Sequence, residues 1–84
     1  MCTYITEILR TKGSAKTSNG WTDVDETVVY FDHPVHFAHE HSLNIDFRNS
    51  NYGPDQRIGL ELSKESARAM AQAILAILDQ VGDL

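Results

Sequence analysis

The sequence predicts an α+β protein in which an antiparallel sheet of about four strands precedes one C-terminal amphipathic helix, in the order ββββα. Segments with β-branched, aromatic or alternating apolar residues follow one another as far as residue 62, and each has the length of a strand. After residue 63, apolar residues instead recur at spacings of three and four, which is typical of an amphipathic helix. The connections are too short for crossover helices, so antiparallel pairing is the simplest arrangement.

Four segments have the composition of strands. The first two are rich in β-branched and aromatic residues, and the second is predicted to be central. The last two alternate apolar and polar residues, as half-buried strands do. Polar stretches at 12–20 and 49–55 are predicted loops, and Asn19-Gly20 is a hairpin-turn signal. The predicted strands are residues 3–10, 27–32, 41–48 and 57–62.

The predicted helix covers residues 64–81 and has a recognisable start and end. Ser63 is placed to accept a hydrogen bond from the backbone N–H of Glu65 or Ser66, as an N-cap does, and Gly82 is placed as the C-terminal glycine. We expect the apolar stripe of this helix to pack on the sheet. The stripe consists of Ala67, Met70, Ala71, Ile74, Ile77, Leu78 and Val81.

The first two strands carry apolar residues at both odd and even positions, for example Val28 and Val29, so both faces of the sheet favour burial. One helix covers only one face. Either the sheet curls around a pocket or a second subunit covers the other face, and we favour a homodimer because a chain of 84 residues has a small core. Ala69, Ala73 and Ala76 form a flank of the helix that another helix or a sheet could approach closely.

Length, charge and cysteine content limit the class of protein. The 84 residues predict a single domain, residues 1–84. The net charge of −5 leaves no basic surface for phosphates, so nucleic acid is not an expected partner. No segment resembles a signal peptide or a membrane span, and the single cysteine, Cys2, excludes an internal disulfide. We therefore expect a soluble cytoplasmic protein without a membrane partner.

All four histidines of the chain fall within nine residues, interleaved with acidic residues. Imidazole titrates near neutral pH, which suits it to acid–base catalysis and to ligand binding. The leading interpretation is a site for a small organic molecule, with no cofactor, in which Asp32, His33 and His41 are the catalytic candidates. The candidates for ligand binding are His36, His39, Tyr30, Arg48 and Trp21.

Two alternatives remain open. In a strand, His39 and His41 project to the same side, and with His33 they could bind a divalent transition metal such as zinc. A non-catalytic interaction module is the other alternative, since each of these residues also has an ordinary structural interpretation.

Several motifs are spread along the chain: Met1-Cys2-Thr3, Gly20-Trp21, Tyr30-Phe31-Asp32-His33-Pro34, Glu40-His41, Asn44-Ile45-Asp46-Phe47 and residues 61–68. Together they resemble a family of small uncharacterised actinobacterial proteins of about 80–90 residues. The resemblance implies a bacterial, cytoplasmic protein and supplies no mechanism. The interpretation then becomes a bacterial small-molecule-binding protein, whose catalytic form would be a cofactor-free proton transfer, condensation or cyclisation in secondary metabolism.

Overall fold

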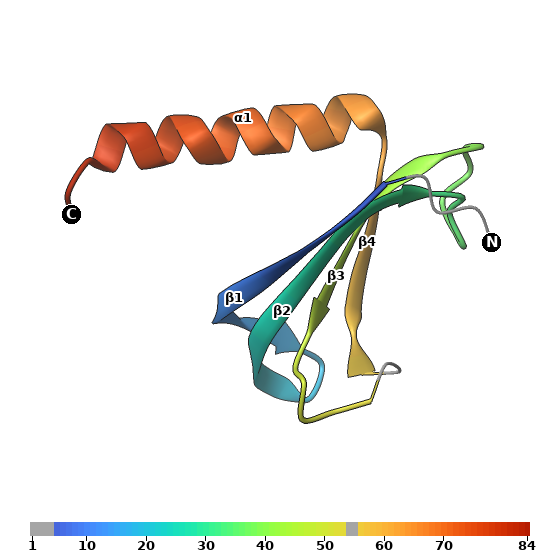
Figure 1. Cartoon of the computed structure of the whole chain (residues 1–84), viewed down its shortest axis with the longest axis horizontal. Helices are drawn as coiled ribbons and strands as arrows, with labels where there is room; N and C mark the ends of the chain where they lie inside the picture. The colour runs from blue at the N-terminus through green and yellow to red at the C-terminus, as the bar shows by residue number, and fades with distance from the viewer. Residues whose placement is uncertain (1–4, 54–55) are drawn as a thin grey trace.

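The computed structural model describes residues 5–53 and 56–84, and within them it has four strands and one helix (Figure 1). The strands form one antiparallel sheet in the order β1-β2-β3-β4, which confirms the predicted ββββα fold with its second strand in the interior of the sheet. Cys2 and the first two residues of the predicted strand 3–10 lie outside the described residues. The elements are β1 (Ile5–Thr17), β2 (Gly20–Asp32), β3 (Ser42–Arg48), β4 (Ile58–Leu62) and α1 (Lys64–Val81).

The β1–β2 hairpin is longer than the sequence predicts. Residues 12–17 belong to β1 and residues 20–26 to β2, so the predicted loop at 12–20 is wrong except for its turn. The chain reverses at Ser18 and Asn19, and Gly20, the first residue of β2, has a φ of 107° that favours glycine. Pairing with β2 satisfies the backbone of the polar stretch, and a register shift between Arg10 and Gly13 marks a bulge.

Register divides the sheet into two different faces. Residues that are directly opposite one another across strands share a face, and successive residues alternate between faces. One face is apolar, with Leu9, Val29, Leu43, Ile45, Leu60 and Leu62. The other is largely polar, with Glu26, Tyr30, Asp32, Ser42, Asn44, Asp46, Arg48 and Glu61.

The bounds of α1 confirm the predicted helix 64–81. Ser63 is the N-cap, and its hydroxyl accepts a hydrogen bond from the backbone N–H of Ser66 at 3.1 Å. Gly82 ends the helix with a φ of 57°, and its N–H donates to the Leu78 carbonyl at 3.3 Å. These ends are fixed by residues next to them in the sequence, which is why the sequence predicts them well.

The prediction that the helix stripe packs along the sheet is wrong for most of its length. Figure 1 shows α1 leaving the end of β4 and diverging from the sheet, and its main sheet contacts are with β3. In the described chain, no residue of α1 is buried. Among the described apolar residues of the whole chain only Val24 is buried. An isolated chain therefore leaves most of the predicted core exposed.

Candidate functional site

The polar face of the sheet is partly covered by the loop of residues 33–41, and one carboxylate holds this loop in place. Glu61 on β4 accepts hydrogen bonds from the backbone N–H groups of Val35, His36 and Phe37, the last two at 3.0 and 2.8 Å. These donors, first that of Val35 and then that of Phe37, lower the pKa of the Glu61 carboxyl, because they stabilise its charged form.

Beside this loop lies a hollow of about 360 Å³, which we call the polar hollow. It is formed where β2, β3 and β4 lie side by side, and His33 and Val35 of the loop complete it. The other residues that line it are Tyr30, Asp32, Asn44, Asp46, Arg57, Gly59, Leu60 and Glu61.

Asp46 is the central carboxylate of the polar hollow. Its Oδ2 accepts a hydrogen bond from the Tyr30 hydroxyl at 3.0 Å and lies 3.4 Å from Nε of Arg57. Its Oδ1 lies over Gly59, the residue opposite it on β4. A Cβ at position 59 would be 3.0 Å from Oδ1, so glycine leaves the space that this carboxylate occupies.

A buried polar group continues the hollow inward. Asp32, Ser42 and Asn44 are buried, Ser42 Oγ donates to Asn44 Oδ1, and Asp32 Oδ1 accepts from the backbone N–H of His33 at 2.7 Å. Among the described residues, no buried side-chain nitrogen or oxygen lacks a hydrogen-bond partner. Such satisfied networks hold their side chains in fixed positions, which favours a preorganised wall.

The polar hollow keeps Tyr30 as a neutral donor. Burial raises the pKa of the Tyr30 hydroxyl, and its hydrogen bond to Asp46 and the charges of Asp46 and Asp32 raise it further, whereas Arg57 opposes them. Three carboxylates and one guanidinium line the hollow. The local potential therefore favours a ligand that presents positive charge or hydrogen-bond donors.

The loop separates the predicted histidine cluster. His33 and His41 stack with ring centroids 5.0 Å apart, His41 also stacks on Phe31, and Nδ1 of His33 lies 3.0 Å from the Glu40 carbonyl oxygen. His39 instead packs edge-on against Phe37, and the His36 side chain is exposed.

The alternative metal set of His33, His39 and His41 is not brought together. Within residues 5–53 and 56–84, no group of three His, Cys, Asp or Glu side chains is placed to hold a metal ion. His39 and His41 instead line a shallow depression with Phe31 and the first residues of α1.

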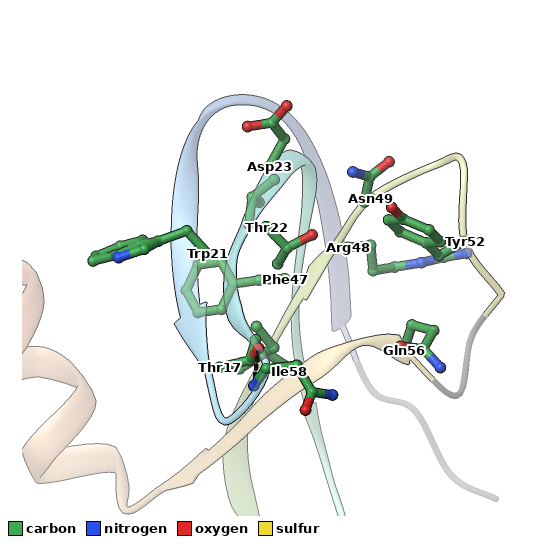
Figure 2. A pocket seen from close by; sticks show the side chains of 12 residues that line it. Thr17, Trp21, Thr22, Asp23, Phe47, Arg48, Asn49, Tyr52, Gln56 and Ile58 are labelled. Atoms are coloured by element: carbon green, nitrogen blue, oxygen red, sulfur yellow. Dashed lines mark hydrogen bonds between the residues drawn. The ribbon is translucent and has the colours of Figure 1, made fainter.

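Two of the predicted ligand-binding residues lie elsewhere. Trp21 and Arg48 line a second hollow of about 290 Å³ at the hairpin end of the sheet, which we call the hairpin hollow (Figure 2). Arg48 points toward Tyr52 there and pairs with Glu26 at 3.2 Å, whereas the Trp21 ring, 70% exposed, extends away from the hollow. The structure thus groups Tyr30, Asp32 and His33 in the polar hollow and stacks His41 on His33. Trp21, Arg48, His36 and His39 do not line this hollow.

Sequence reasoning missed the residues that complete the polar hollow. Asp46 lies on β3, Gly59 and Glu61 lie on β4, and Arg57 directly precedes β4. The pairing of β2 with β3 and of β3 with β4 brings them beside Tyr30. The sequence signal for this polar face was the alternation of polar residues 44, 46 and 48 with apolar residues in the same predicted strand.

Comparison with known proteins places the chain in a family. A family model matches residues 1–83. The chain belongs to the family of unknown function DUF6295. No curated protein and no solved structure matches it. The DUF6295 match spans every residue of the polar hollow. In the part of this DUF6295 chain that the structure describes, no helix is long and apolar enough to cross a membrane.

Proposed function

We propose that this chain is a bacterial, cytoplasmic protein that binds a small organic molecule in the polar hollow. The observation that carries the proposal is the convergence of Tyr30, Asp46 and Arg57 over the glycine at position 59. The ligand presents a protonated amine, or a comparable group of hydrogen-bond donors, to the carboxylates.

The choice of a cationic group follows from the charges around the polar hollow. Asp32, Asp46 and Glu61 outnumber the one guanidinium, that of Arg57. Both contacts of Asp46 go to Oδ2, so Oδ1 is the oxygen that faces a ligand donor. The Asp46 side chain is only 14% exposed, and partial burial strengthens a charge-assisted hydrogen bond.

The same hollow supports a catalytic form of this function. His33 lines the hollow, and an imidazole is suited to accept a proton from a bound molecule. A cofactor-free proton transfer, as in a condensation or cyclisation, would use this imidazole as the general base while the carboxylates hold the ligand. Binding is the step that both forms share.

Titration with benzylamine, followed by two-dimensional amide NMR, tests the proposal. We expect shifts at residues 30, 46 and 59, and we expect Asp46→Asn to weaken binding by about tenfold or more, because the charge on Oδ1 is lost. Asp23→Asn in the hairpin hollow is the matched control and should bind as the wild type does. Shifts confined to the hairpin hollow, or equal losses in the two variants, would contradict the proposal.

A further inference from the structure

The side of the sheet opposite the polar hollow carries an open groove between α1 and the apolar face, which we call the apolar groove. Its volume is about 660 Å³. Leu9, Val29 and Ile45 lie on its sheet side, and Ala67, Met70 and Ile74 lie on its helix side. Lys64 and Arg68 of α1 stand at its edge.

The apolar stripe of α1 continues beyond this groove without cover. Ile74, Ile77 and Leu78 are 53%, 60% and 57% exposed. Ile5 and Leu9 on the neighbouring edge strand are exposed as well. An apolar surface of this extent is unusual for a monomer and marks an interaction site.

The chain exposes more surface than a compact monomer of its mass does, and this excess matches the area that a stable dimer buries. A compact monomer of 9.4 kDa is expected to expose about 5,000 Å². This chain exposes 6770 Å², about 1,800 Å² more. Its radius of gyration is 14.1 Å, whereas a compact chain of this length has about 12 Å. Covering the excess on two copies corresponds to an interface of about 3,500 Å², which lies in the range of obligate homodimers.

We propose that α1 of a second copy of this chain fills the apolar groove, and that the exchange is reciprocal. In such a two-fold dimer each helix buries its stripe against the sheet and the helix of its partner. Ala67 and Ala71 line the groove and leave room for a close helix–helix approach.

Sedimentation equilibrium of the full chain tests the dimer itself. We expect the wild type to have twice the mass of 9.4 kDa at micromolar concentration. Leu78→Glu, within the stripe, should give a helical monomer, whereas the matched control Gln72→Glu, at an exposed position on the opposite side of α1, should remain dimeric. A monomeric wild type, or equal behaviour of the two variants, would overturn the proposal.

The dimer and the polar hollow are on opposite faces of the sheet, so the two proposals can fail separately. If a variant loses benzylamine binding but remains dimeric, the result tests the polar hollow and leaves the dimer proposal unaffected.

Discussion

Replacing Tyr30 with Phe removes one atom from the centre of the polar hollow. The hydroxyl donates to Asp46 Oδ2 at 3.0 Å, and the ring keeps its place on β2 in the variant. Asp46 retains its contact with Arg57 at 3.4 Å. The substitution therefore deletes a single charge-assisted hydrogen bond and little packing.

The expected loss of stability follows from that bond. A hydrogen bond to a charged group contributes about 1.5–3 kcal/mol when its partner is left unsatisfied. Arg57 still compensates Asp46 and the carboxylate is 14% exposed, so we expect a loss at the lower end of this range, about 1.5 kcal/mol. Urea unfolding at pH 7, at one fixed protein concentration, measures it.

The pH dependence provides a second measure of the same contact. The pKa of Tyr30 is raised in the folded protein above its ordinary value of 10.0. Folding therefore favours the neutral phenol, and this contribution is complete below the unfolded pKa and lost as the pH rises through the folded pKa. The wild type should lose more stability than Tyr30→Phe as the pH rises above 10.0.

Two results would refute this reasoning. One is a change in unfolding free energy of less than about 0.5 kcal/mol at pH 7, the level of an ordinary surface substitution. The other is an identical alkaline profile for the wild type and the variant.

Three further predictions concern the loop, the glycine and the helix. Glu61→Gln should speed amide hydrogen exchange at residues 35–37, because the carboxylate accepts hydrogen bonds from these N–H groups. In the wild type the protection from exchange should persist above pH 4.5 and be lost as the pH falls through the lowered pKa of Glu61. Unchanged exchange in the variant would mean that the carboxylate does not hold the loop. Gly59→Ala should weaken benzylamine binding while changing stability by less than about 1 kcal/mol, because the new Cβ crowds Asp46 Oδ1 but suits a strand. Unchanged binding would argue against the hollow. Ser63→Ala should lower the free energy of unfolding by about 1 kcal/mol, measured by thermal unfolding, because the N-cap hydrogen bond is lost. An unchanged free energy would show that the N-cap does not stabilise the protein.

The parts of the fold that depend on neighbouring residues were predictable from the sequence. The N-cap at Ser63 and the glycine at 82 bound α1 as the sequence predicts, and alternation identifies β3 and β4 within one residue. The extension of β1 through Lys12–Thr17 was not predictable in this way. Its polar residues resemble a loop, and only pairing with β2 makes them a strand.

The position of α1 is a matter of tertiary packing. A stripe of apolar residues shows that a helix needs a covered face, but it does not show what covers it. The sequence led us to expect the chain's own sheet, whereas most of the stripe is exposed in the single chain. The apolar residues at both parities of the first two strands led us to expect a second copy on the face opposite the helix, whereas the exposed apolar groove lies on the side of α1.

The candidate site was predictable only in part. Tyr30, Asp32 and His33 are close in the sequence and also line one hollow, but the loop turns His36 and His39 away from it. Asp46, Gly59 and Glu61 come from other strands, and their proximity depends on register, which composition does not reveal.

The ratio of the affinities for benzylamine and benzyl alcohol tests the central claim most directly. The two probes have the same ring and size, and only the amine carries a charge at pH 7. If Asp46 Oδ1 recognises a cation in the polar hollow, the amine should bind about tenfold or more tightly, and Asp46→Asn should bring the ratio close to one. Equal affinities in the wild type, or a ratio that survives Asp46→Asn, would contradict the account.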